Sequence, residues 1–285
     1  MEELRGPELV INLEDCFMTF AGVTGSRTRL LVLASATVAA LTGTVLSPAQ
    51  AAPPKAAPPA PVVFTSSGGY AIPKDVKSVL VTVLGAGAGG RGGNADVDAD
   101  RVGRGGPGGG GGGMAQCIVN VDGRALQAGE KLSVAVGRGG LGGRGQDVER
   151  LAVTTGGDGG QSSVDLPGYA EGRQGPAWVA IASGGSPARN FSGGEGGKGS
   201  KCYPDWSTKS ALADGGSSKA TSPTAGSAGS EGGLGAANDV IRKHCRPGAG
   251  NGGAGGNGVI RNGLTPAAGK PGMSGMSGCV VLTFS

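Results

Sequence analysis

The chain has 285 residues, of which 62 are glycine and only 4% are aromatic, so the composition excludes a thick aromatic core. Hydrophobic residues make up 38% of the chain, which is too many for a fully disordered protein. The net charge of +4 is mild and no dense run of Lys or Arg occurs, so the composition does not indicate a nucleic-acid-binding protein.

The N-terminal part has the features of a secretory signal. Arg27 and Arg29 precede an uncharged apolar run at residues 30–46, and a small-x-small cleavage pattern ends at Ala51. The segment before Met18 is unusual for a signal, so Met18 is an alternative start. The run is short for a membrane span and lacks a cationic flank behind it. We therefore expect residues 1–51 to be removed and the protein to be secreted; a retained anchor is the alternative.

A Pro/Ala-rich stretch follows the expected cleavage point. Residues 52–63 predict an extended, semi-rigid tether that holds the next domain away from the N-terminus or docks on a partner. We assign residues 64–285 to a single glycine-rich domain.

Short runs rich in β-branched residues predict strands along this domain. They are Lys77–Leu84, Met114–Val121, Gly129–Gly137, the "SSVDL" segment at 162–166, Trp178–Ser183 and the terminal "CVVLTFS" at 279–285. Helical periodicity is weak, and Gly235–Cys245 is the best short-helix candidate. The pattern predicts an all-β fold, a small antiparallel, jelly-roll-like β-sandwich from which the glycine-rich tracts are long excursions.

The glycines of these tracts repeat every third residue. The runs are Gly87, Gly90, Gly93; Gly103, Gly106, Gly109, Gly112; Gly137, Gly140, Gly143; Gly193, Gly196, Gly199; Gly226, Gly229, Gly232, Gly235; and Gly250, Gly253, Gly256. A period of three fits left-handed polyglycine or polyproline-II-type helices, which have no internal hydrogen bonds. Packed side by side, such segments can bond to one another. The alternative is a flexible linker.

Four cysteines follow the expected cleavage point: Cys117, Cys202, Cys245 and Cys279. An even number in an exported chain predicts two disulfides with three possible connectivities, and the wide spacing argues against zinc. We favour Cys202–Cys245 as a staple of the loop region and Cys117–Cys279 between strands. Free thiols are the alternative.

Motifs for cofactors and catalysis fail in their context. Gly85, Gly87 and Gly90 have the spacing of a dinucleotide fingerprint, but the glycine-rich tract behind them cannot start a helix. Asp96, Asp98 and Asp100 resemble the start of a calcium loop without the remaining ligands, so calcium is a weak alternative to a solvated loop. His244 is the only histidine, and no catalytic serine elbow occurs. We expect no enzyme and no cofactor.

The "KCYPDW" stretch at 201–206 is a candidate contact site. Tyr203, Pro204 and Trp206 gather beside a cysteine in a predicted loop, which suits binding to a protein or a glycan. The alternative is a local mini-core that covers the disulfide.

The order of segments resembles a known family. "FTSSGGYAIPKDVKSVLVTVLGAGAGG", "GGGGGGMAQCIVNV" and the closing "GCVVLTFS" are similar to the glycine-rich domain of secreted bacterial proteins and phage tail-fibre tips, with a related region in the ectodomain of anaplastic lymphoma kinase. The resemblance covers residues 64–285 and implies a β-sandwich with polyglycine helices whose loops bind receptors or partner subunits. It carries over no catalytic residue.

Together these features predict a secreted, non-enzymatic binding or adaptor module, such as a subunit of an extracellular assembly. It would contact proteins or surface glycans through its loop tips and N-terminal tail. The alternative is a cell-surface or cell-wall structural protein, and a third hypothesis is a hydrolase on a β-sandwich.

Overall fold

A computed structural model describes residues 57–96, 103–121, 126–149, 152–166, 178–202, 207–222, 224, 226–262 and 265–285. The chain divides into two units, Met1–Pro54 and Lys55–Ser285, and the second holds every described residue. The expected signal at residues 1–51 lies outside the described residues. Among those described, no helix has the length and apolar character needed to cross a membrane.

The second unit contains a sandwich of two antiparallel five-stranded sheets, which confirms the predicted fold class. One sheet has the order β1-β10-β3-β4-β9 and the other β2-β5-β6-β7-β8. The strands are β1 (Val62–Phe64), β2 (Gly68–Ala71), β3 (Ser78–Leu84), β4 (Met114–Asn120), β5 (Lys131–Ala135), β6 (Ser162–Asp165), β7 (Trp178–Ala182), β8 (Lys201–Cys202), β9 (Ser207–Ala213) and β10 (Cys279–Phe284). All six predicted strands are present. The short edge strands β1, β2 and β8, and the longer β9, were not predicted.

The sandwich core is aliphatic. Val79, Val81 and Val83 on β3 alternate inward and pack with Leu132 of β5 and Val164 of β6. A smaller cluster lies on the outer face of the first sheet, where Ile241 of the helix α1 (Asp239–His244) covers Leu84 and Val281. The predicted helix region is therefore helical only in its C-terminal half, where the side chain of Asn238 caps the helix by accepting from the N–H of Ile241 (3.0 Å).

Both disulfides are present, but the favoured pairing was wrong. The bonds are Cys117–Cys202 and Cys245–Cys279. Cys117 of β4 faces the sandwich interior and joins the first sheet to β8 of the second, whereas Cys279 belongs to the outer cluster under α1. Because Cys117 and Cys279 lie on opposite faces of one sheet, they cannot meet.

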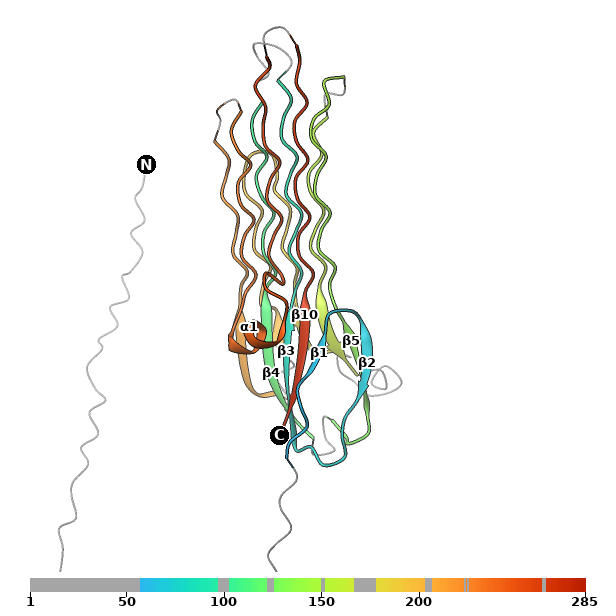
Figure 1. Cartoon of the computed structure of the whole chain (residues 1–285). Helices are drawn as coiled ribbons and strands as arrows, with labels where there is room; N and C mark the ends of the chain where they lie inside the picture. Colours follow the sequence, from blue (N-terminus) through green and yellow to red (C-terminus); the bar gives the residue numbers. More distant parts are fainter. Residues whose placement is uncertain are drawn as a thin grey trace, which may run out of the picture. The chain divides into compact units, whose positions relative to one another are not determined.

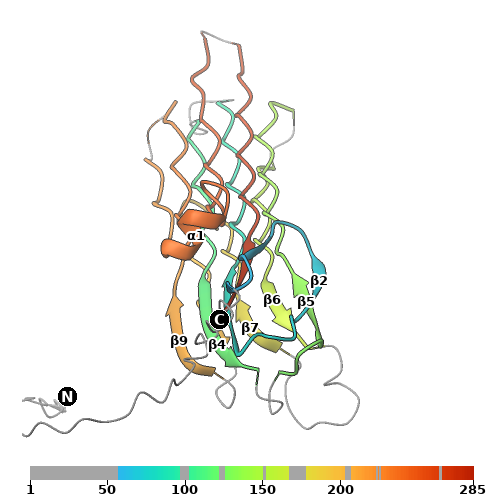
Figure 2. The same ribbon diagram turned by 60° about the horizontal axis from the view of Figure 1, so that its bottom comes forward.

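The glycine-rich excursions leave the sandwich at one end and run side by side (Figures 1 and 2). They pair as outgoing and returning segments: 85–96 with 103–113, 137–149 with 152–161, 183–188 with 193–200, 214–222 with 226–237, and 250–262 with 265–278. We call these segments together the glycine bundle. Since antiparallel strands enclose most pairs, the pairs project from the same edge of the sandwich.

Backbone hydrogen bonds between segments hold the bundle together. In segment 85–96, successive N–H groups donate to three different segments in rotation, and each acceptor steps back by three residues. The pairs are Gly85 to Gly113, Ala86 to Gly160, Gly87 to Met276, Ala88 to Gly110, Gly89 to Gly157 and Gly90 to Met273. This rotation is what a segment with three residues per turn produces. The packing of the glycine runs against one another is therefore confirmed, while their form as left-handed polyglycine or polyproline-II-type helices stays a prediction.

Two segments form the centre of the bundle. Segment 85–96 is enclosed by a closed ring in which each member also bonds to the next: 137–149, 152–161, 183–188, 103–113, 250–262 and 265–278. Segment 103–113 is enclosed in the same way by 85–96, 183–188, 193–200, 214–222, 226–237 and 250–262. The bundle is thus two fused hexagonal rings around adjacent central segments.

This arrangement explains where glycine is needed. A Cβ added to Gly110 would lie 1.8 Å from the carbonyl oxygen of Glu195, and one added to Gly112 would lie 2.0 Å from that of Gly85. Neither glycine has positive φ, so space rather than backbone conformation requires glycine. The uninterrupted run Gly108–Gly113 falls in a central segment, because there every side of the chain meets another backbone.

Gly110→Ala should therefore destabilise the protein by about 3 kcal/mol, because the new methyl group collides with backbone that cannot rotate away. The matched control is Gly68→Ala in β2, where the Cβ would make an ordinary contact of 3.6 Å with Phe64. Urea unfolding followed by circular dichroism should show a large loss for the first variant and no loss for the second. Equal stabilities would contradict the packing argument.

Replacing Cys117 and Cys202 together by Ala should lower the free energy of unfolding by about 2–5 kcal/mol, because the bond closes a long loop. Its sequence separation is 85 residues, against 34 for Cys245–Cys279. The same measurement on the Cys245→Ala, Cys279→Ala variant should show a smaller loss. A larger loss for that second variant would contradict the loop-length argument.

Candidate interaction surfaces

The sequence-predicted contact residues fall outside the part of the chain that the structure describes. Tyr203, Pro204 and Trp206 lie between Cys202, the last residue of β8, and Ser207, the first of β9. The register places Cys202 beside Ala180 of β7. Cys202, the described residue before this stretch, is bonded to Cys117.

The acidic triplet is only partly described. Asp98 and Asp100 lie outside the described residues. Asp96 is buried, its carboxylate accepts from the backbone N–H of Arg261 (3.0 Å), and its backbone pairs with Ala267. Asp96 thus joins segment 85–96 to the last excursion. No group of three or more potential metal ligands occurs among the described residues, and calcium at Asp96, Asp98 and Asp100 stays an untested alternative to the predicted solvated loop.

The shortest excursion has a described tip that sequence reasoning did not single out. Its turn contains Asn190, with φ of 53°, and Phe191. The Phe191 ring lies 4.8 Å from the guanidinium carbon of Arg91 and 5.5 Å from that of Arg104, and Arg91 also donates to the carbonyl of Asn190. Arg91 and Arg104 belong to the two central segments, so cation–π contacts dock this tip on the bundle. Burial lowers the pKa of Arg91.

Small polar side chains fix the outer segments where backbone acceptors are absent. Ser227 and Ser230 accept from the N–H groups of Gly105 and Gly108. Across the bundle, the same role belongs to Asn251 for Gly235, Asn257 for Gly229, and Ser217 for Gly196. Outer segments can therefore be bonded inward and still leave their outward positions free for longer side chains.

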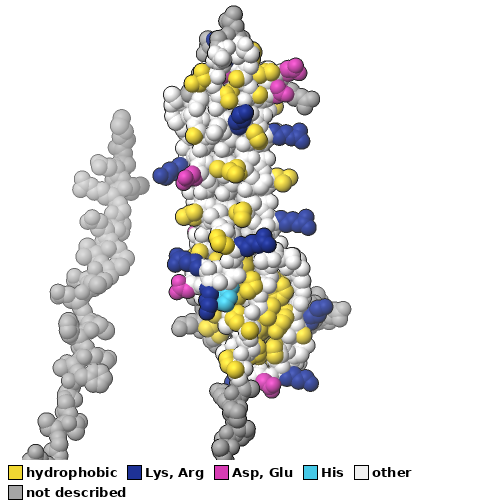
Figure 3. All heavy atoms as spheres, viewed as in Figure 1, with side chains coloured by type: hydrophobic (Ala, Val, Ile, Leu, Met, Phe, Trp, Pro, Cys, Tyr) yellow, Lys and Arg dark blue, Asp and Glu magenta, His cyan; other side chains and the backbone are white. Residues whose placement is uncertain are grey.

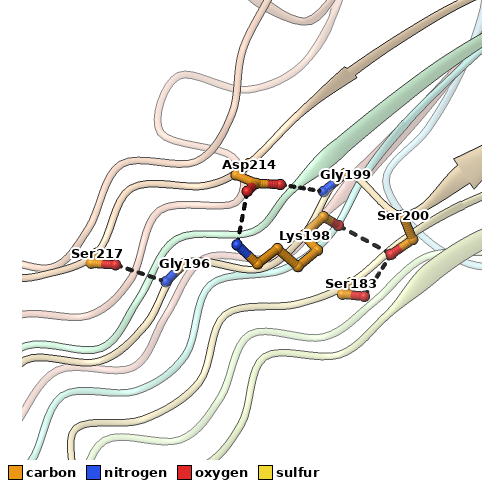
Figure 4. A network of polar contacts seen from close by, with 7 residues as sticks. All are labelled: Ser183, Gly196, Lys198, Gly199, Ser200, Asp214 and Ser217. Carbon is orange, nitrogen blue, oxygen red and sulfur yellow. Dashed lines mark hydrogen bonds and ion pairs between the residues drawn. The ribbon is translucent and has the colours of Figure 1, made fainter. Parts of the chain in front are cut away.

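One such contact is an ion pair at the base of the bundle (Figure 4). Asp214 accepts from the Lys198 ammonium (2.9 Å) and from the backbone N–H of Gly199 (3.1 Å), so it joins segment 214–222 to 193–200. The hydrogen bond from Lys198, together with that from Gly199, lowers the pKa of Asp214, and the same pair raises the pKa of Lys198. Both side chains are exposed.

Acid should release this contact. Because the pKa of Asp214 is lowered on folding, its contribution is complete above the unfolded value of about 3.9 and is lost as the pH falls through the folded value. In an NMR titration, the Gly199 amide proton should shift with a midpoint below about 3.9. The Gly197 amide, which donates to the carbonyl of Gly111, should stay unchanged.

The control is Asp214→Asn, which keeps an acceptor for Gly199 but cannot titrate. Its Gly199 amide should show no such transition. A wild-type midpoint at or above the unfolded value, or an unchanged transition in the variant, would contradict the assignment.

Two depressions flank the base of segment 265–278, at its junction with the sandwich. One, of about 560 Å³, is lined by Ser67 and Arg138, and the other, of about 260 Å³, by Arg246 and Met276. Thr65, Gly275 and Ser277 line both. Both contain hydroxyl groups, glycine backbone and one arginine, and the smaller one also has apolar lining from Ala249 and Met276. This set can bind an anion or a peptide, and it offers no nucleophile–base pair.

Comparison with known proteins gives one match. Residues 65–285 match the model of a family described as a glycine-rich domain, which covers most of the chain. No curated protein matches the sequence.

Proposed function

The chain belongs to the glycine-rich domain family, and we propose that it acts as a secreted, non-enzymatic binding or adaptor module. In this proposal it is a subunit of an extracellular assembly that contacts partners through its loop tips and its N-terminal tail. The finer resemblance, to secreted bacterial proteins and phage tail-fibre tips, is part of the proposal. Two disulfides are compatible with an extracellular protein.

The observation that carries the proposal is the polarity of the second unit. The excursions leave one end of the sandwich, as Figure 1 shows. The chain enters at the other end, because Val62, the first residue of β1, pairs with Leu282, whereas Phe64 pairs with Val280 near the bundle. A tail before Val62 and the turns of the excursions are thus presented at opposite ends, as a linking module requires.

Rigidity of the bundle supports a module over bulk structural material. Every segment is bonded to others through its backbone, and the central glycines leave no space for a Cβ. Loops carried on a fixed scaffold lose little entropy on binding. A bulk glycine-rich material would not need a defined register between segments far apart in the sequence.

The test is capture of partners by immobilised residues 52–285 from the culture medium of the source organism, identified by mass spectrometry. A partner that binds through the tips should be lost on Arg189→Glu, which changes an exposed tip residue. The matched control is Arg242→Glu on α1, at the base of the bundle. A partner of the tail should be lost when residues 52–61 are removed.

The second measurement is gel filtration with light-scattering detection of residues 52–285 in the same medium. An adaptor should elute in a complex larger than the free protein. The proposal would be overturned if the protein stays monomeric and captures no partner. It would also be overturned if neither the tip variant nor the truncation reduces the amount of captured partner.

A further inference from the structure

Two adjacent outer segments of the glycine bundle carry an ordered set of exposed side chains. In segment 137–149 every third residue points outward, whereas segment 265–278 exposes two residues of every three, a longer side chain at 270, 273 and 276 and a Pro or Ser at 271, 274 and 277. Backbone bonds fix the register between them, since Gly275 donates to Gly140 and Gly272 donates to Gly143. We give the name lateral face to the surface made by six of their longer outward side chains: Arg138, Leu141, Arg144, Lys270, Met273 and Met276.

The lateral face has three rows. The spatial proximity of Gly139 to Met276, Gly142 to Met273 and Gly145 to Lys270 sets which residues stand level. The row nearest the sandwich therefore combines Arg138 with Met276, the middle row Leu141 with Met273, and the outer row Arg144 with Lys270. Cations thus stand at both ends of an apolar centre. Figure 3 shows hydrophobic and basic side chains alternating along this side of the bundle.

The apolar centre is unusually open to solvent. Leu141 is 76% exposed and Met273 66% exposed. Neither belongs to the two buried hydrophobic clusters of the described residues. Apolar side chains grouped on a surface and rimmed by charge are typical of a protein interaction site.

Two exposed carboxylates border these rows without belonging to them. Asp147 follows Arg144 one repeat farther out on the same segment. Asp158 belongs to segment 152–161, which borders 137–149 on the side away from 265–278, as the order of the ring requires. At the sandwich end, Arg246 adds a cation, since it lines the depression that also contains Met276. The field over the three rows is therefore positive.

We propose that the lateral face binds an extended acidic peptide in the polyproline II conformation. Rows three residues apart in a chain that rises about 3.1 Å per residue are about 9 Å apart. A polyproline II ligand has the same period, so its residues i, i+3 and i+6 can meet all three rows. A β-strand cannot match them, because its i+3 residue points to the opposite face. The ligand would carry acidic residues at i and i+6 and an apolar residue at i+3.

The chemistry of the face favours a peptide over a membrane or a glycan. A flat bilayer cannot enter the two depressions beside Gly275 and Ser277. An acidic glycan would leave Leu141 and Met273 without an apolar partner. The two segments also contain no aromatic residue on which a sugar ring could stack among their described positions. This surface lies apart from the tips and the tail, so it adds to the proposed function and is tested separately.

The test measures fluorescence anisotropy of a labelled proline-rich nonapeptide with glutamate at positions two and eight and leucine at position five. A control peptide of the same composition has glutamate at positions three and seven. The mature chain should bind the first peptide with roughly fivefold lower Kd than the second. Binding should weaken with added salt, since charge pairs contribute.

Two variants remove the contacts: Leu141→Ser with Met273→Ser, and Arg138→Ser with Arg144→Ser. Each should weaken binding about tenfold. Matched controls on other outer segments are Leu234→Ser, at a residue 70% exposed, and Lys219→Ser, and both should bind as the unchanged protein does. Unchanged thermal unfolding would show that all variants remain folded, as expected for exposed positions.

Several outcomes would overturn the proposal. They are equal affinity for the two peptides, an equal loss in the control variants, or no binding up to about 1 mM peptide. Binding of heparin or of anionic phosphatidylserine vesicles without binding of the peptide would assign the face to a glycan or to a membrane instead. None of these results would bear on the tip and tail contacts, which the capture experiment measures.

Discussion

The second unit depends on the close approach of one backbone to another. Each segment of the glycine bundle forms its backbone hydrogen bonds with other segments, because it has none within itself. That approach leaves about 2 Å between the site of an added Cβ and the carbonyl oxygen opposite, as at Gly112. Glycine is therefore fixed by volume. In the glycine bundle, backbone hydrogen bonds take the place of an apolar core, which explains how the protein can fold with so few aromatic residues.

The sandwich makes this bundle possible because it aligns the ends of the segments. Segment 85–96 follows β3 and segment 103–113 leads into β4, and these two strands are neighbours in one sheet. Each sheet therefore sets the spacing of the segments that are connected to its strands. The Cys117–Cys202 disulfide joins the two sheets. The helix α1 and Cys245–Cys279 secure the last excursion, which supplies two neighbours to segment 85–96 and one to segment 103–113.

Six of the strands, the presence of two disulfides and the packing of the glycine runs could be predicted, because each leaves a local pattern in the sequence. The β9 sequence "STKSALA" has no β-branched run, and only pairing with β4 makes it a strand, so its local sequence could not indicate it. Disulfide pairing depended on which face of a sheet each cysteine occupies, which spacing does not encode. One signal was readable: the uninterrupted run Gly108–Gly113 marks a segment enclosed by other backbones, although the second central segment, with Ala86 and Ala88, shows no such run.

The same constraint limits where function can reside. The central glycines admit no side chain, and most inward positions of the outer segments hold glycine or a small residue such as Ala188 or Ala236, so long side chains are concentrated at outward residues and turns. On the outer segments, many outward residues are small or polar, such as Ser274 and Asn257. Large apolar groups at Leu141 and Met273, level with each other and between cations, depart from that background. Leu234 and Ile260 are exposed as well, so the grouping of Leu141 and Met273 between cations, rather than exposure alone, is what supports the proposed peptide contact.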